Sequence, residues 1–244
     1  MQPIWSEPFK IKSFDIDTTG KLRLSSLFEY LQEVAGNHAE NIEVGYDQLQ
    51  EKNLFWVLSR MKLNIERLPK WNETIEIKTW PKGIDKLFAI RDFEIFDSAK
   101  KLIISVTSSW LLIDSIKHRL HKIEELQIPI PESDIKPAIK EFPDKIVPVE
   151  GDSISHFHSI KYSELDILQH VNNSRYISWI YDCYQPEFLN SNELKSIQIN
   201  YLDEAKFSDN LEIKLIAVNN DRHYIEGLKT TTNSNSFQAL LEWK

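Results

Sequence analysis

The chain has 244 residues, 41% hydrophobic and 27% charged, which is typical of a globular protein and excludes a long disordered or repetitive chain. Its formal net charge of −8 provides no overall attraction for nucleic acid or anionic lipid. The sequence has only six glycines and no glycine-rich phosphate-binding motif, so a nucleotide enzyme is disfavoured.

The sequence carries no signal for an oxidising compartment or a membrane. The single cysteine, Cys183, cannot form an intramolecular disulfide, and the N-terminal segment lacks the basic and apolar regions of a signal peptide. The most apolar stretch, residues 102–113, is interrupted by serines and a threonine and is shorter than the roughly 20 residues of a membrane helix. We expect a cytoplasmic protein with no membrane span.

The first half is expected to hold one helix followed by about four strands. The helix begins at Ser26, where Glu29 completes a capping box. Its apolar positions have helical spacing and are Leu27, Leu31, Val34 and His38. Branched and aromatic residues then predict strands, which include 75–79, 88–96 and 102–113.

The second half is expected to repeat this order after a linker. Five of the ten prolines fall within residues 115–153, which lack sustained apolar periodicity, and they are Pro129, Pro131, Pro137, Pro143 and Pro148. A helix is predicted at 173–184, with Tyr176, Ile180 and Cys183 on one face. Strands are predicted at 194–202, 211–218, 222–231 and 237–243.

These two halves are similar in residues as well as in element order. Matching Asp17 to Asp166 gives an offset of 149, at which Tyr30 meets Trp179. A helix covered by an antiparallel sheet, repeated twice, predicts an α+β tandem (double) hotdog. We expect one pseudo-dimeric body with a continuous sheet, divided into an N-terminal hotdog (1–114), a linker (115–153) and a C-terminal hotdog (154–244).

The turn before the second helix is the strongest candidate for a reactive site, because it gathers several polar side chains. Asp166 and His170 can approach each other there, which would set the tautomer of the imidazole and raise its basicity. Asn172 or Asn173 would cap the helix. The free amides of the helix start suit a developing oxyanion, such as that of an acyl carbonyl.

Residues 162–179 resemble the acyl-acyl carrier protein (acyl-ACP) thioesterases of plants and bacteria, whose second hotdog carries the pattern D-x-N-x-H-V-N-N-x-x-Y-x-x-W. The matching residues are Asp166, His170, Val171, Asn172, Asn173, Tyr176 and Trp179. In the first half the resemblance covers 30–33, 35–39, 56–61, 79–81 and 91–95. A third block, 199–205, is similar to the family strand that contributes a catalytic glutamate, and Glu204 occupies that position.

Two positions depart from the family pattern. The family asparagine between the Asp and the His is replaced by Leu168, which has no hydrogen-bonding side chain, so catalysis is expected to be slowed rather than abolished. One hypothesis is that Gln169 or Asn172 supplies the missing amide. Where some plant members have a cysteine after the glutamate, this chain has Ala205. A cysteine nucleophile is excluded there, and Cys183 is no substitute because it lies on the apolar face of a helix.

The resemblance implies hydrolysis of a fatty acyl-ACP thioester without a covalent serine, a cofactor or a metal. Glu204 would act as general base on water, Asp166 would position the site, and His170 would polarise the thioester or protonate the leaving group. Asn172, Asn173, Trp80 and Trp56 would bind substrate, with the acyl chain in the N-terminal hotdog. The partners are then the acyl carrier protein and the fatty acyl chain.

Plainer interpretations remain open beside these roles. His170 is otherwise a surface loop residue and Glu204 a solvated strand residue, whereas Trp56 and Trp80 would be ordinary sheet packing. His38 is a buried, hydrogen-bonded histidine or a pocket wall rather than a catalytic group. The alternative functions are an acyl-coenzyme A thioesterase of the same fold and a non-catalytic acyl-thioester-binding hotdog protein. Formation of a homodimer is also open.

Overall fold

The computed structural model describes residues 2–126 and 136–244, which form two compact units. Unit 1 comprises Met1–Arg23 and Glu29–Pro143, and unit 2 comprises Leu24–Phe28 and Asp144–Lys244. Two of the prolines that marked the expected linker, Pro129 and Pro131, lie outside the described residues.

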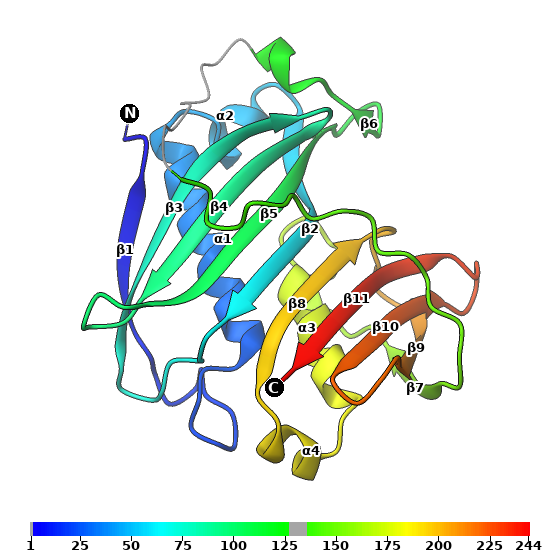
Figure 1. Ribbon diagram of the computed structural model, residues 1–244. Coiled ribbons are helices and arrows are strands. Elements are labelled where there is room, and N and C mark those ends of the chain that lie inside the picture. The colour runs from blue at the N-terminus through cyan, green and yellow to red at the C-terminus, as the bar shows by residue number, and fades with distance from the viewer. Residues whose placement is uncertain (1, 127–135) are drawn as a thin grey trace. The chain divides into compact units, whose positions relative to one another are not determined.

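Unit 1 contains an antiparallel sheet whose strands lie in the order β1-β3-β4-β5-β2, with β6 paired to β5 (Figure 1). Helix α1 packs against β1, since its Tyr30 ring lies 4.7 Å from the ring of Phe9 and its His38 ring lies 6.1 Å from that of Trp5. The elements are β1 (Trp5–Lys10), α1 (Leu24–Asn41, which belongs to this unit from Glu29 onward), α2 (Tyr46–Gln50), β2 (Leu54–Ile65), β3 (Thr74–Asp85), β4 (Phe88–Phe96), β5 (Leu102–Asp114) and β6 (Arg119–Leu120).

Unit 2 contains an antiparallel sheet in the order β7-β9-β10-β11-β8. Helix α3 packs on this sheet through Tyr176, whose ring lies 5.3 Å from Tyr201 on β8 and 5.4 Å from Phe237 on β11. The elements are β7 (Ile154–Ser159), a 3₁₀ turn (Tyr162–Glu164), α3 (Asn173–Asp182), α4 (Pro186–Ser191), β8 (Leu194–Tyr201), β9 (Asn210–Ala217), β10 (Arg222–Lys229) and β11 (Asn235–Trp243).

Each unit is therefore a hotdog, and the predicted tandem hotdog is confirmed. The sheet orders of the two units correspond strand by strand, with β1 equivalent to β7 and β2 equivalent to β8. Both β1 and β7, and both α1 and α3, begin 149 residues apart, the offset that the sequence indicated. The short helices α2 and α4 were not predicted, because neither is long enough to show a helical period.

The repeat extends to single hydrogen bonds in the loop before each helix. The N–H of Asp17 donates to the carbonyl of Lys21 at 2.8 Å, and the N–H of Asp166 donates to that of His170 at 2.8 Å. Both loops also contain a residue with positive φ, Gly20 at 76° and Gln169 at 65°. The two loops thus have the same backbone turn, although their side chains differ.

The predicted start of the first helix is wrong by two residues. Helix α1 begins at Leu24, and its N-cap residue Arg23 has no side-chain cap, so no capping box forms at Ser26. Backbone bonds fix the preceding residues instead, since the N–H of Arg23 donates to Asp15 and that of Leu22 to Pro69, both at 2.8 Å. The helix therefore starts before its polar signal, and Ser26 is buried.

The described part of the expected linker is divided between the two units: residues up to Pro143 bond to unit 1, whereas the carbonyl of Asp144 accepts hydrogen bonds from Gln198 and Asn200 in unit 2. The N–H of Ala138 donates to Asp92 Oδ2 at 2.9 Å, and Arg60 Nη1 donates to the carbonyl of Pro143 at 3.0 Å. The boundaries expected for the linker, 115 and 153, stay a prediction.

Two glycine substitutions are expected to change stability in opposite directions. In Gly227→Ala the new Cβ would lie 2.2 Å from the ring of Phe237, its cross-strand partner, and this clash should cost about 1–3 kcal/mol. In Gly36→Ala, at an open and exposed site inside α1, the methyl group should add about 0.5–1 kcal/mol of stability. Urea unfolding measures both, and equal effects of the two substitutions would contradict this assignment.

Candidate active site

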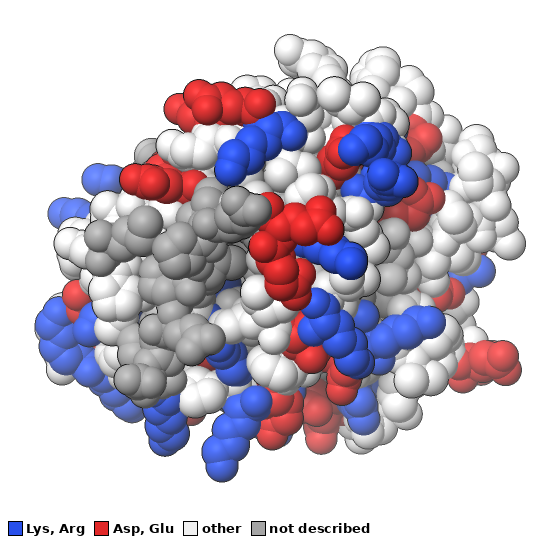
Figure 2. Space-filling model, turned by 90° about the horizontal axis from the view of Figure 1, so that it is seen from above, with Lys and Arg blue, Asp and Glu red and all other residues white. Residues whose placement is uncertain are grey.

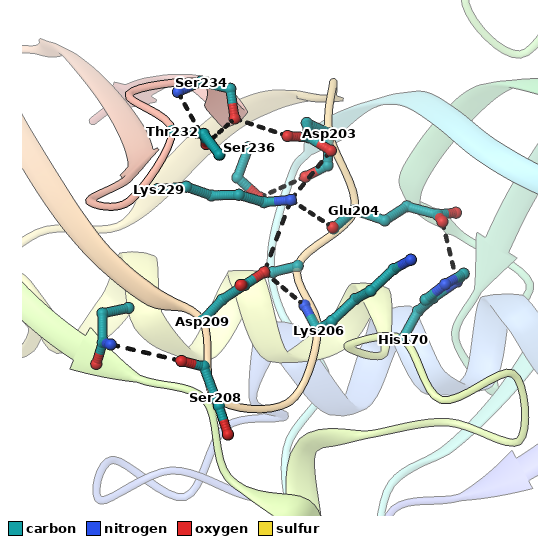
Figure 3. A network of polar contacts seen from close by, with 12 residues as sticks. His170, Asp203, Glu204, Lys206, Ser208, Asp209, Lys229, Thr232, Ser234 and Ser236 are labelled. Carbon is teal, nitrogen blue, oxygen red and sulfur yellow. Dashed lines mark hydrogen bonds and ion pairs between the residues drawn. The ribbon is translucent and has the colours of Figure 1, made fainter.

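His170 and Glu204, the two central residues of the predicted site, lie side by side in unit 2. His170 Nδ1 lies 2.9 Å from Glu204 Oε2 (Figure 3). His170 comes from the loop before α3, and Glu204 from the turn that follows β8. Their side chains are 22% and 43% exposed, so both have access to solvent. A carboxylate beside an imidazole fixes which ring nitrogen carries the proton.

The other ring nitrogen of His170 is available for a reaction. In the described part of the chain, Nε2 of His170 has no hydrogen-bond partner, whereas Nδ1 has Glu204. When Nδ1 donates its proton to the carboxylate, Nε2 can accept a proton or, in the charged ring, donate one. The pair therefore has the arrangement that general acid–base catalysis requires.

Asp166 does not orient the imidazole, which corrects the expectation that it sets the tautomer of His170. Its Oδ1 accepts the backbone N–H groups of Leu168 at 2.8 Å and His170 at 3.2 Å. The positive φ of Gln169 turns these amides inward, and the carboxylate satisfies them. Asp166 thus holds the loop that carries His170, and Glu204 is the group that meets the ring.

Asn172 is the N-cap residue of α3, as one of the two predicted alternatives required. Its Oδ1 accepts the N–H of Ser174 at 2.9 Å, and its carbonyl accepts the N–H of Arg175 at 2.9 Å. Two amides of the helix start are thereby occupied. Of the helix-start amides that were expected to be free, this leaves the N–H of Asn173, which is the first residue of the helix and is half-buried.

The turn bearing Glu204 is tied to the loop bearing His170 through Ala205. The N–H of Val171 donates to the Ala205 carbonyl at 3.0 Å, and the N–H of Ala205 donates to the hydroxyl of Tyr176 at 3.0 Å. Burial raises the pKa of Tyr176 to about 12, so this hydroxyl keeps its proton at neutral pH. The tyrosine of the family pattern thus has a structural role beside Glu204.

No side-chain amide takes the place of the family asparagine at position 168 through Leu168 itself. Leu168 is half-buried and contributes its backbone N–H to Asp166. Gln169 is exposed, and Asn172 already uses its side-chain oxygen as a cap. That Gln169 or Asn172 replaces the family asparagine stays a hypothesis, and it fails when Gln169→Ala and Asn172→Ala each leave turnover unchanged.

The remaining predicted residues lie in other places. Trp56 on β2 and Trp80 on β3 belong to unit 1, where Trp56 Nε1 donates to the carbonyl of Val44 at 2.9 Å and Trp80 is buried. Their role in substrate binding stays a prediction. Cys183 is buried at the C-cap of α3, and burial raises its pKa to about 12, which removes thiolate character at neutral pH.

His38 is a fully buried histidine with a partner on each ring nitrogen. Arg91 Nη1 lies 2.9 Å from Nδ1 and donates to it, while Nε2 lies 2.8 Å from the carbonyl of Gln2 and donates to it. The ring is therefore neutral. Burial, followed by the charge of Arg91, lowers the pKa of His38 to about 4.

This lowered pKa makes stability depend on pH. An unfolded chain protonates His38 below its ordinary pKa of 6.5, whereas the folded chain resists protonation down to about 4, so stability falls as pH decreases across that window. The loss should reach about 3 kcal/mol at the acid end. Urea unfolding at pH 7 and pH 5 should show a smaller difference for His38→Gln than for wild type. The variant His121→Gln, at a half-buried loop position, is the control, and an unchanged difference in His38→Gln contradicts the assignment.

Residues 2–126 and 136–244 include no group of three His, Cys, Asp or Glu side chains that could hold a metal ion. Within the same ranges no helix is sufficiently long and apolar to cross a membrane.

Profiles of one family match both halves of the chain. Residues 3–129 match "Acyl-ACP thioesterase N-terminal domain", and residues 148–244 match "Acyl-ACP thioesterase C-terminal domain". A palmitoyl-acyl carrier protein thioesterase from Gossypium hirsutum is 30% identical over 215 residues, covering 83% of this chain and 52% of the relative. An oleoyl-acyl carrier protein thioesterase from Coriandrum sativum is 27% identical over 225 residues, covering 84% and 60%. The chain thus spans about half the length of the curated relatives it matches.

Two solved structures resemble nearly the whole chain. An acyl-ACP thioesterase from Bacteroides thetaiotaomicron superposes with a TM-score of 0.91 and 26% identity, covering 99% of this chain and 98% of that one. A 12:0-ACP thioesterase from Umbellularia californica shares the fold, with a TM-score of 0.88, 21% identity, and coverage of 100% and 98%.

Proposed function

The chain belongs to the acyl-ACP thioesterase family, and from this premise we propose that it hydrolyses fatty acyl-ACP to a free fatty acid and the carrier thiol. The observation that supports this most directly is the 2.9 Å contact between His170 Nδ1 and Glu204 Oε2. It joins the two residues that the family pattern assigns to chemistry, and both are accessible to solvent.

In the proposed reaction, Glu204 accepts a proton from the attacking water. Its Oε2 holds His170, which leaves Oε1 for the water. The charged imidazole donates its Nε2 proton to the departing sulfur, so that the thiol leaves neutral. One positioned acid or base of this kind contributes about 10²–10⁴-fold to the rate.

The start of α3 supplies the proposed contact for the thioester oxygen. The N–H of Asn173 has no acceptor in the described ranges, and it lies at the positive end of the helix dipole. One donor aimed at a developing oxyanion contributes about 10²–10³-fold. Asp166 acts indirectly, because its carboxylate holds the backbone of the His170 loop.

The proposed carrier is an acyl carrier protein, with coenzyme A as the alternative. On the face seen in Figure 2, acidic and basic side chains are interspersed rather than separated by sign. Residues 117–122 contain two lysines, one arginine and two histidines, and this charge is partly neutralised because Lys117 pairs with Asp114 at 3.2 Å. The choice between the two carriers therefore rests on the family resemblance.

The test is release of free thiol from acyl-ACP and acyl-coenzyme A substrates that carry the same acyl chain. Multiple turnovers with acyl-ACP, at a higher kcat/KM than with the coenzyme A ester, are expected. The reverse preference would favour an acyl-coenzyme A thioesterase. Stoichiometric binding without thiol release would contradict hydrolysis and favour an acyl-thioester-binding protein.

A further inference from the structure

Lys229, at the end of β10, places a nearly buried ammonium group under the turn that carries Glu204. Its side chain is only 10% exposed. Nζ lies 2.7 Å from the carbonyl oxygen of Glu204, 3.0 Å from Asp203 Oδ1 and 3.7 Å from Asp209 Oδ2 (Figure 3). A lysine ammonium has three donors, of which the Glu204 carbonyl and Asp203 Oδ1 lie within hydrogen-bond distance of Nζ, and Asp209 adds an ion pair.

The contact with Glu204 is to its backbone, and it completes a clamp on one peptide group. On one side of the Glu204–Ala205 peptide, the carbonyl accepts a hydrogen bond from Lys229. On the other side, the N–H donates to the hydroxyl of Tyr176 at 3.0 Å. A peptide group held at both its oxygen and its nitrogen is restrained against rotation, which limits backbone motion at the residue from which the Glu204 carboxylate extends.

Further bonds keep the neighbouring residue in place. The hydroxyl of Ser234 donates to Asp203 Oδ2 at 2.7 Å, and that of Ser236 donates to the Asp203 carbonyl at 2.7 Å. Burial alone would raise the pKa of Asp203, but the hydrogen bonds from Ser234 and Lys229 outweigh it and lower that pKa. The carboxylate therefore stays charged opposite the ammonium.

Unit 1 has an equivalent ion cluster in which the charges are exchanged. There Arg67, on the turn, lies 2.6 Å from Glu73 and 2.9 Å from Asp97, the residue after β4. By the strand pairing of the two sheets, Asp97 occupies the place of Lys229. A carboxylate has no donor and cannot hold a carbonyl of the turn. A side chain at this position can hold the turn carbonyl only when it is a donor, as Lys229 is in unit 2.

We propose that Lys229 is a positioning residue, whose ammonium fixes the Glu204–Ala205 peptide so that the Glu204 carboxylate is held against His170 Nδ1. This inference rests on the proposed function of Glu204 and His170. Burial of an ammonium group is costly unless the group is paired with an acid. The pairing of Lys229 with Asp203 lies in the same turn as Glu204.

The first test compares Lys229→Met with a matched control on the same sheet. Lys214 on β9 also pairs with an acid, Glu212 at 3.6 Å, but it does not contact the Glu204 turn. Lys229→Met should lower kcat about 10–100-fold with KM little changed, because small displacements of a reacting group are costly. Lys214→Met should retain the wild-type kcat. A wild-type kcat in folded Lys229→Met overturns the proposal.

A double-mutant cycle separates positioning from a general structural role. Since Lys229 acts through Glu204, Lys229→Met should cause no further loss of kcat in a Glu204→Gln background. Multiplication of the two losses overturns the proposal. Should Lys229→Met fail to fold, Lys229→Arg keeps the paired charge but moves the donors to a planar fork. Its kcat should be about 3–10-fold below wild type, and a wild-type value again overturns the proposal.

The nitrogen NMR signals of His170 distinguish this inference from the proposed function. In Lys229→Met the Nδ1 signal should shift away from its carboxylate-bound position, whereas Lys214→Met should not change it. A wild-type enzyme without thioesterase activity, combined with this shift, contradicts the function and supports the clamp. The opposite result is an inactive Glu204→Gln, together with a fully active Lys229→Met whose Nδ1 signal is unchanged. It would contradict the role of Lys229 and leave the proposed function standing.

Discussion

Glu204→Gln is expected to lower kcat for thioester hydrolysis about 10²–10⁴-fold while leaving KM within a few-fold of wild type. The amide has nearly the shape of the carboxylate but cannot accept a proton from water. It also removes the negative charge that faces His170 Nδ1 at 2.9 Å. Steady-state measurement of free thiol release gives both constants.

The control for this variant is Glu212→Gln. Glu212 lies on β9 of the same sheet and pairs with a lysine, but it belongs to no part of the proposed site. Its substitution should leave kcat unchanged. Glu204 is not the general base when Glu204→Gln retains more than a tenth of the wild-type kcat with the same substrate.

His170→Gln is expected to cause a loss of similar size, about 10²–10⁴-fold in kcat. The glutamine amide can still meet Glu204, but it cannot deliver a proton to the departing sulfur. The matched control is His121→Gln, since His121 also lies near a carboxylate, with Nε2 3.7 Å from Glu125 Oε2. Wild-type turnover in His170→Gln would remove the imidazole from the mechanism.

Combining the two substitutions tests whether the pair acts as a unit. Residues that share one catalytic task give losses that do not multiply, so the double variant should be about as slow as the slower single variant. Multiplied losses would mean that His170 and Glu204 act independently, despite the contact between them.

The order of elements was largely predictable from the sequence, because long strands and helices bury regular apolar patterns. The offset of 149 between Asp17 and Asp166 was also visible in the sequence, because both loops form the same turn. The start of α1 was not predictable from Ser26 and Glu29. Backbone bonds from Leu22 and Arg23 to distant residues determine it, and such bonds leave no local side-chain signal.

The members of the site were predicted by resemblance, but their contacts were not. Asp166 is near His170 in sequence, which suggested a contact with the ring, yet the turn uses that carboxylate for backbone amides. The partner of the ring is Glu204, 34 residues away, which only the folded chain brings near. Lys229 was missed altogether, because a lysine at the end of a strand is usually solvated.

Because the backbone is duplicated, comparing the two units separates the residues that the hotdog fold needs from those that the proposed reaction needs. Features common to both copies, such as the Asp17 and Asp166 turns, are requirements of the hotdog backbone. Where the copies differ, with Lys21 at the place of His170 and Asp97 at the place of Lys229, the fold tolerates either residue. The freedom to vary one copy while the other keeps its reactive groups is what tandem linkage provides and a symmetric pair of identical chains lacks.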